Sequence, residues 1–159
     1  MRFEKPSWNK IDRMCEELAK KIKKSGFEPD LIVGIARGGW VPARILSDIL
    51  NNKSIASIGV VFYKGIGTTA RKPELTHKLP VNIKGKRILM VDDVADTGES
   101  LVFAKKKLTG AKEVKVATLH MKPWSKFKPD FYINTTDAWL VYPWERRETL
   151  RKLKKHAYK

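Results

Sequence analysis

The sequence predicts an α/β fold in which helices flank a central, mostly parallel, twisted sheet. Short apolar runs of the kind that form buried strands alternate along the chain with segments of helical periodicity. The 159 residues, 42% of them hydrophobic, are enough for one domain with a sizeable core. No internal repeat and no Gly/Ser-rich linker divides the chain, so a single domain is expected over residues 1–159.

The first predicted element is an amphipathic helix that begins after Ser7 and ends at Gly26, residues that suit an N-cap and a helix stop. Its apolar residues recur at intervals of three and four, which places them on one face. They are Trp8, Ile11, Cys15, Leu18 and Ile22. Cys15 is the only cysteine, which excludes a disulfide framework or a zinc ribbon within the chain, and its position predicts a buried core residue.

A buried strand is predicted over residues 30–36, because a short and mostly apolar run is typical of a strand covered on both faces. A glycine-containing turn then leads into a helix. Pro42 fits the first turn of that helix, where the fixed φ of proline is suitable. Val41, Ile45 and Ile49 follow at intervals of four and predict its buried face.

A second strand is predicted over residues 55–63. Residues 64–80, which follow it, contain few apolar side chains, so they predict a long mobile loop. The basic residues of this loop are candidates for contacts with an anion, and each is equally compatible with a solvated loop. They are Lys64, Arg71, Lys72 and Lys78.

A third strand is predicted over residues 87–92 and ends in an acidic residue. The helix after it carries Leu101, Lys105 and Leu108 on one face and ends at Gly110. Ligands of such sheets bind beyond the carboxyl ends of the strands, so the loops that follow the strands are the places to look for a site.

The composition of the chain changes after a fourth predicted strand at residues 114–120. From Met121 onward the sequence is rich in aromatic residues, Pro and Lys, with short extended stretches predicted over 131–133 and 138–142. The basic tail, residues 146–159, is interpreted most simply as a solvated helix end, with a subunit interface or incidental RNA binding as alternatives.

The charge of the chain is its extreme property. Thirty-three Lys and Arg residues against 17 Asp and Glu give a net charge of +16. Such a charge attracts polyanions, so it is compatible with nucleic acid and equally with a small, highly phosphorylated substrate. No apolar run approaches the ~20 residues of a transmembrane helix. The sequence therefore predicts a soluble, cytoplasmic protein with no membrane partner.

Three carboxylates follow the third predicted strand within five residues: Asp92, Asp93 and Asp96. The stretch Thr97-Gly98-Glu99-Ser100 then opens a helix. Backbone N–H groups at a glycine turn and a helix N-terminus bind phosphate, and hydroxyl groups can add donors. Carboxylates suit sugar hydroxyls, or a Mg²⁺ ion shared with a pyrophosphate. A ligand with a phosphate at one end and vicinal hydroxyls satisfies both halves; the alternative is an acidic loop that only caps the helix.

This stretch closely resembles the motif by which type I phosphoribosyltransferases bind 5-phosphoribosyl-1-pyrophosphate (PRPP): an apolar strand, two acids, two residues and Asp-Thr-Gly-x-Ser/Thr. The resemblance extends over residues 8–145 and implies the type I phosphoribosyltransferase fold. It implies a core at about 7–120 and a small hood, the part that covers the base, mainly at 121–145. The residues implied to bind the ribose and 5′-phosphate are Asp92, Asp93, Ala95, Asp96, Thr97, Gly98, Glu99 and Ser100.

The turn after the first strand resembles the pyrophosphate loop of this family and consists of Ala36, Arg37, Gly38 and Gly39. Glycines let backbone amides approach an anion closely, and an arginine suits the charge of pyrophosphate. The resemblance implies a cis peptide between Ala36 and Arg37, and a flexible lid at 64–80. The alternative is a tight turn with a surface arginine.

The hood resembles that of purine phosphoribosyltransferases of the xanthine/guanine/hypoxanthine group, especially short archaeal and bacterial members, through Lys122-Pro123 and Trp139-x-x-x-Pro-Trp-Glu145. The resemblance implies that Lys122 donates to a 6-oxo group, that Trp139 stacks on the purine and that the backbone of Leu140 reads its edge. Glu145 is implied to accept from a guanine N2–H or to contact metal. Alternatives are a surface Lys122 and a core Trp139; Trp124 and Trp144 are interpreted as packing residues.

The implied reaction joins a 6-oxopurine to PRPP and yields a nucleoside 5′-monophosphate and pyrophosphate. Asp96 is implied to be the general base that takes the proton from purine N7. Mg²⁺ is the implied cofactor, held by Asp92 and Asp93 directly or through water, with Glu145 as a further candidate. The resemblance also implies a homodimer or homotetramer.

Two alternatives stay open. A regulator that keeps this fold, senses nucleotides and binds nucleic acid through its basic surface would also explain the charge. The retained Asp96, Arg37 and hood favour the enzyme. An enzyme of the same fold acting on adenine or another base is the second alternative, and Lys122 and Trp139 argue against it.

Overall fold

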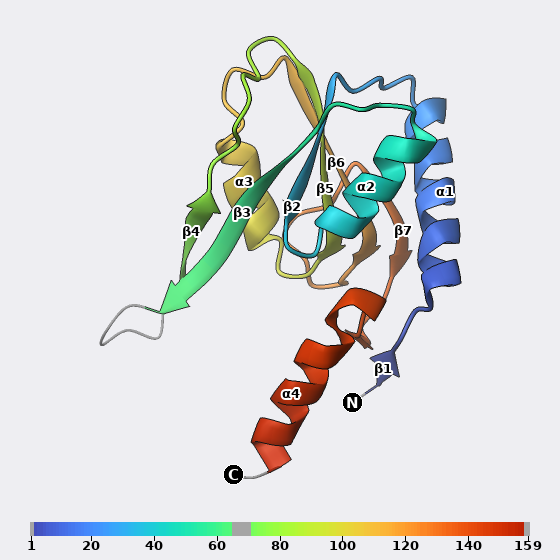
Figure 1. The fold of residues 1–159 in the computed structure, drawn as a ribbon, viewed down its shortest axis with the longest axis vertical. Coiled ribbons are helices and arrows are strands. Elements are labelled where there is room, and N and C mark those ends of the chain that lie inside the picture. Colours follow the sequence, from blue (N-terminus) through green and yellow to red (C-terminus); the bar gives the residue numbers. More distant parts are fainter. Residues whose placement is uncertain (1, 65–70, 158–159) are drawn as a thin grey trace.

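A six-stranded sheet forms the centre of the protein, with its strands in the order β4-β3-β2-β5-β6-β7. The computed structural model describes residues 2–64 and 71–157 (Figure 1). Neighbouring strands run parallel except β3 and β4. The strands are β2 (Leu31–Ala36), β3 (Ile55–Lys64), β4 (Arg71–His77), β5 (Arg87–Ala95), β6 (Glu113–Met121) and β7 (Phe131–Thr135). The predicted α/β class with a mostly parallel sheet is confirmed.

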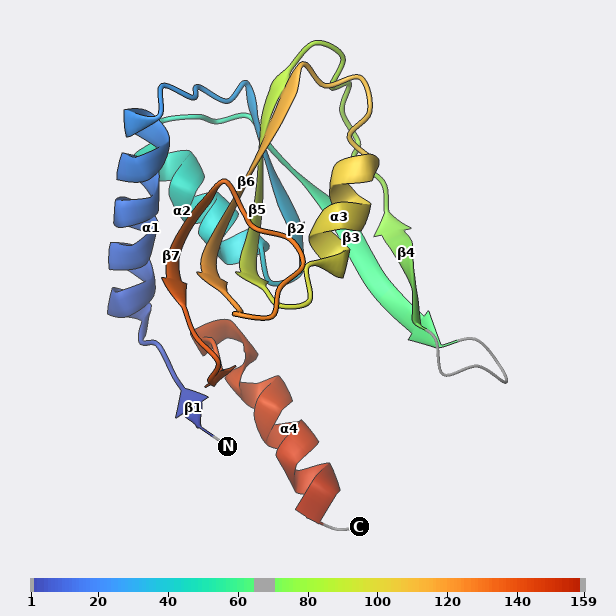
Figure 2. The ribbon, with the colours of Figure 1, turned by 180° about the vertical axis from the view of Figure 1, so that it is seen from behind.

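Helices cover both faces of this sheet. Those that pack on it are α1 (Trp8–Lys24), α2 (Trp40–Ile49) and α3 (Glu99–Lys106). Figures 1 and 2 show α1 and α2 on one face and α3 on the other. Side chains alternate along a strand, so Ile32 and Leu89 pack under α1 and α2, whereas Val33 and Met90 pack under α3. The sheet is therefore buried on both faces, which explains its apolar strands.

Helix α1 begins and ends where its sequence predicts. The Ser7 hydroxyl accepts a hydrogen bond from the Lys10 amide at 3.2 Å, and Gly26 has a φ of +76°. Cys15 is buried, and burial raises the pKa of its thiol to about 12. Trp8 departs from the prediction, because it is 54% exposed. It begins the helix at the end that overhangs the sheet, where its ring packs against Trp144 at 5.8 Å.

The buried face of α2 lies one position away from the predicted one. Its buried residues are Pro42, Ala43, Leu46 and Ser47, whereas the predicted Val41, Ile45 and Ile49 are half-buried. The reason is a close approach of α2 to β2. A Cβ added at Gly34 would lie 3.1 Å from the Cβ of Ala43, so small residues face each other there.

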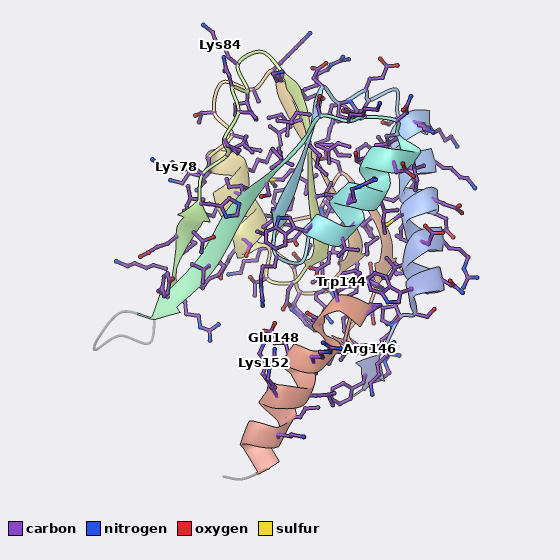
Figure 3. The ribbon with its side chains drawn as sticks, in the orientation of Figure 1. Lys78, Lys84, Trp144, Arg146, Glu148 and Lys152 are labelled. Atoms are coloured by element: carbon purple, nitrogen blue, oxygen red, sulfur yellow. The ribbon has the colours of Figure 1, made fainter. Side chains whose placement is uncertain are left out.

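The prediction of a loop over 64–80 is wrong for Arg71–His77, which form β4 and pair antiparallel with β3. An edge strand with one solvated face buries few side chains, and β4 packs only Leu75 against the core, so it carries little apolar signal. Pro73 is tolerated there because it lies on an edge strand. Arg71 and Lys72 are exposed on β4. Lys78 follows the end of β4 that is remote from α4 (Figure 3). Residues 65–70 and the side chain of Lys64 lie outside the described part of the chain.

The start of the chain lies below the carboxyl edge of the sheet, beside the segment that precedes the last helix (Figure 1). Strand β1 (Phe3–Glu4) pairs parallel with β8 (Trp139–Leu140), with Phe3 opposite Trp139. The single turn η1 (Pro143–Glu145) and helix α4 (Arg146–Ala157) follow. Helix α4 extends away from the body of the protein, in agreement with a solvated basic tail. Across residues 2–64 and 71–157, no helix is both long and apolar enough to cross a membrane.

We expect Gly39→Ala to lower the free energy of unfolding by about 3 kcal/mol, since a side chain there has no space. A Cβ at Gly39 would lie 2.3 Å from the carbonyl oxygen of Val91 and 2.7 Å from that of Ile35. Urea unfolding measures the change. Arg44→Ala, on the exposed side of the same helix, should stay within about 0.5 kcal/mol of the wild type. Equal stability of Gly39→Ala and Arg44→Ala would contradict the close approach.

Candidate active site

The loop that follows β2 touches the end of strand β5. These strands are neighbours in the sheet, so their carboxyl ends lie side by side. A Cβ added at Gly38 would lie 2.3 Å from Oδ2 of Asp93, and Gly39 is equally close to the backbone of Val91. The structure thus brings the predicted pyrophosphate loop against the predicted acidic pair, and at Gly39, where backbone atoms are the obstacle, only glycine permits this spacing. The peptide between Ala36 and Arg37 is cis, as the resemblance implies.

A cavity of about 450 Å³ opens at this junction. Its walls combine both loops with the region around η1. The predicted site residues that line it are Ala36, Arg37, Gly38, Asp92, Asp93, Ser100 and Glu145. Trp144 and Glu148, for which the sequence indicated no site role, also line it.

The acidic residues of the cavity are half-buried and repel one another. Burial raises the pKa of Asp92, and the charge of Asp93 raises it further. Burial likewise raises the pKa of Asp93, to which Glu145 adds its repulsion. Burial also raises the pKa of Glu145, whose Oε1 accepts a hydrogen bond from the Tyr142 amide at 3.1 Å. A hard divalent cation with oxygen ligands would relieve this repulsion, so the residues fit Mg²⁺.

No three His, Cys, Asp or Glu side chains converge closely enough to hold a metal by themselves in the described part of the chain. Glu145 therefore does not complete a protein-only metal site with Asp92 and Asp93. A cation bound at this edge would need further oxygen ligands from a bound molecule or water, which is the manner in which Mg²⁺ binds at phosphate sites.

The predicted phosphate loop wraps the start of α3. Gly98 has a φ of +87°, and a Cβ there would lie 2.6 Å from the Cβ of Phe127. The Thr97 hydroxyl accepts from the Glu99 amide at 3.3 Å, and the Thr97 carbonyl accepts from the Lys126 amide at 3.1 Å. Glu99 is exposed, so its charge points away from the loop. The first N–H groups of a helix have no partner within it, which leaves donors for an anion here.

Asp96 has a partner that sequence reasoning missed. The indole Nε1 of Trp124 donates to Oδ1 of Asp96 at 3.0 Å. Trp124 is 54% exposed, so its interpretation as a packing residue is wrong. The contact forms because the segment after β6 stays beside the acidic loop: the Lys122 amide bonds to the carbonyl of Ala95 at 2.9 Å, and the Lys126 amide to that of Thr97 at 3.1 Å. No local pattern in the sequence signals this.

Of the predicted base-binding residues, Lys122 is linked to Asp96 through Trp124, which contacts both. Lys122 is buried, so its interpretation as a surface lysine is wrong. Its ammonium donates to the carbonyl of Ala138 and lies 5.4 Å from the ring centre of Trp124. Trp139 is 53% exposed, so it is no core residue, whereas Leu140 is buried. The roles of Lys122, Trp139 and Leu140 toward a base stay predictions.

A buried hydrogen-bond chain joins the hood to the acidic loop. The Tyr142 hydroxyl donates to the carbonyl of Asp93 at 3.0 Å and lies 2.8 Å from Nδ1 of His120. Since that hydroxyl has one proton, Nδ1 of His120 carries the proton of the second bond. Burial lowers the pKa of His120 to about 4, so the ring is neutral. Tyr142 also stacks on Trp144 at 4.7 Å, which confirms a packing role for Trp144.

Comparison with known proteins agrees with this arrangement. The family model described as "Phosphoribosyl transferase domain" matches residues 7–147. The hypoxanthine-guanine phosphoribosyltransferase of Schizosaccharomyces pombe is 30% identical, with 89% of this chain and 88% of that protein aligned. The xanthine-guanine phosphoribosyltransferase of Cereibacter sphaeroides is 32% identical, with 87% and 84% aligned.

Solved structures show the same fold. A purine phosphoribosyltransferase from Pyrococcus horikoshii superposes with a TM-score of 0.83 at 40% identity, covering 91% of this chain and 94% of that one. A Neisseria gonorrhoeae protein with bound ppGpp superposes with a TM-score of 0.80 at 27% identity, covering 99% and 98%. The fold, the contact of the loop after β2 with the end of β5 and these similarities lead to one conclusion: the chain belongs to the phosphoribosyltransferase family.

Proposed function

We propose that this protein is a purine salvage enzyme that converts a 6-oxopurine (guanine, hypoxanthine or xanthine) and PRPP into the nucleoside 5′-monophosphate and pyrophosphate. The observation that carries the proposal is the contact of the loop after β2 with the acidic end of β5, beside a cavity that reaches Ser100 on α3. The relatives named as hypoxanthine-guanine and xanthine-guanine phosphoribosyltransferases support the class of base.

PRPP fits this junction in one orientation. Its 5′-phosphate is bound by the N–H groups and hydroxyls of Thr97–Ser100, and its ribose hydroxyls by Asp92 and Asp93. Its pyrophosphate lies against Arg37, Gly38 and Gly39, where the backbone can approach closely. Mg²⁺, which Asp92 and Asp93 would hold directly or through water, would neutralise part of the charge of pyrophosphate.

The chemistry exchanges one bond at ribose C1′ for another. The bond to the pyrophosphate oxygen breaks, and its electron pair leaves with pyrophosphate. The new bond forms to a purine nitrogen, and positive charge develops on the ribose between these events. The carboxylates below the ribose stabilise that charge, and Arg37 stabilises the departing anion.

Asp96 is the proposed general base, which takes the proton from purine N7. The Trp124 indole donates to Oδ1 of Asp96, which fixes the carboxylate and leaves Oδ2 to accept the proton. Lys122 would donate to the 6-oxo group of the base and would meet the amine of adenine as donor against donor. Trp139 would stack on the ring, and the backbone of Leu140 would read its edge.

Glu145 belongs to the pyrophosphate side of the site in this proposal. Glu145 and Asp93 line the same cavity, and the charge of Glu145 raises the pKa of Asp93. Lys122 and Trp139 are not among the residues that line that cavity. The assignment favours the metal over a guanine N2–H. A homodimer or homotetramer and a cytoplasmic location complete the proposal and rest on family resemblance.

We expect turnover of 6-oxopurines with PRPP and Mg²⁺, and a loss of about 10²–10⁴-fold in kcat for Asp96→Asn, because asparagine cannot accept the N7 proton. Pyrophosphate release measures both. Asp12→Asn, an exposed acid on α1, is the matched control and should retain full activity. Nucleotide binding without turnover by the wild type would favour the regulator instead, and salt-dependent nucleic-acid binding would then be measured.

Trp124→Phe keeps the ring and removes the N–H that holds Asp96, so we expect kcat to fall about three- to tenfold. Steady-state kinetics with hypoxanthine at saturating PRPP tests this. Trp8→Phe alters a tryptophan of equal exposure, 54%, elsewhere in the protein and should leave kcat unchanged. Equal rates for Trp124→Phe and Trp8→Phe would remove Trp124 from the mechanism.

Lys122→Gln should lower kcat/KM for hypoxanthine about 30-fold, because a buried, charged donor to the 6-oxo group is replaced by a shorter, neutral amide. The KM for PRPP should stay within about twofold, which shows that the variant is folded. Lys128→Gln, at an exposed position of the hood, is the control. A KM for PRPP that rises as much as that for the base would argue against a base-reading role.

A further inference from the structure

Helix α4 inserts a carboxylate into the predicted pyrophosphate site. Glu148 lies on the first turn of α4 and lines the same cavity as Arg37 and Asp93. Figure 3 shows Glu148 and Lys152 on one side of α4.

The contacts of Glu148 are short and charged. Its Oε2 lies 2.6 Å from the guanidinium of Arg37, and its Oε1 lies 2.8 Å from the ammonium of Lys152. These two cations lower the pKa of Glu148, so it is ionised at neutral pH. The Arg37 side chain is 74% exposed, whereas that of Glu148 is 34% exposed. The carboxylate is thus the less exposed partner of this ion pair.

A carboxylate on a guanidinium makes the same charge-assisted bonds as a phosphate oxygen on a guanidinium. Arg37 is also the only arginine of the loop that is proposed to bind pyrophosphate. A pyrophosphate that takes Arg37 must replace Glu148. It must also enter a cavity in which Asp92, Asp93 and Glu145 already add negative charge.

We propose that Glu148 is an intramolecular competitor of pyrophosphate for Arg37, and that it sets the affinity of the site for pyrophosphate and for the pyrophosphate end of PRPP. This inference rests on the proposed function. Glu148 forms its ion pair with Arg37 again when pyrophosphate leaves, and this favours the release of pyrophosphate as product. Lys152 holds the carboxylate in place for this exchange.

Titration calorimetry of the full chain with Mg²⁺ and pyrophosphate tests the proposal. We expect Glu148→Gln to lower the Kd for pyrophosphate about two- to fivefold, as suits the loss of one partly exposed ion pair. Glu148→Ala, which removes the acceptor, should show at least the same gain. Glu17→Gln removes the same charge from an exposed position on α1 and should leave the Kd unchanged.

A double-mutant cycle separates competition from a general gain in positive charge. In an Arg37→Gln background, competition predicts that Glu148→Gln no longer tightens binding. An unchanged or raised Kd for Glu148→Gln alone, or a full gain that persists without Arg37, would overturn the inference.

The proposed function can fail independently of this inference. If the wild type turns over 6-oxopurines and binds pyrophosphate, but Glu148→Gln binds it equally well, only the competition is refuted. If the wild type neither turns over nor binds pyrophosphate, the site assignment itself is refuted and the competition with it.

Discussion

The backbone of the loop after β2 touches the end of β5 so closely that Gly39 has no room for a side chain, and Gly38 lies against the Asp93 carboxylate. This contact is possible because β2 and β5 are adjacent parallel strands whose carboxyl ends lie at one edge. It fixes the distance between backbone N–H groups that suit an anion and carboxylates that suit a ribose or a cation. A shift of either strand would separate these two halves and remove the cavity.

Keeping two carboxylates side by side at the end of β5 is electrostatically unfavourable. Asp92 and Asp93 are half-buried beside each other, and burial and repulsion both oppose their ionisation. The hood fixes the backbone at this point, since the Tyr142 hydroxyl donates to the carbonyl of Asp93 and is itself held by His120. The site is therefore rigid in its backbone and charged on its surface, which is the arrangement expected of a preorganised anion and cation site.

Local patterns predicted the parts of the fold and site that local physics determines. Caps and periodicity located α1, and the acidic loop was recognisable because its acids, glycine and hydroxyls are contiguous. Strand β4 was missed because an edge strand with solvated side chains has no apolar alternation. Trp124, Tyr142 and Glu148 were missed because each acts on a residue far away in the sequence. Such contacts depend on tertiary packing, which no spacing reveals.

The pairing of β1 with β8 has a consequence for the order in which the site can assemble. Strands β2 and β5, with the phosphate and pyrophosphate loops, come from residues 31–100 and can pack before the chain is complete. The segment with Trp139 gains its strand partner only when Phe3, from the opposite end of the sequence, pairs with it. This pairing spans nearly the whole chain and closes a long loop, so it is expected to form late in folding. The half of the site that would hold the phosphates is thus expected to form first. The half that would select the base is completed when the N-terminal strand pairs with Trp139 and Leu140.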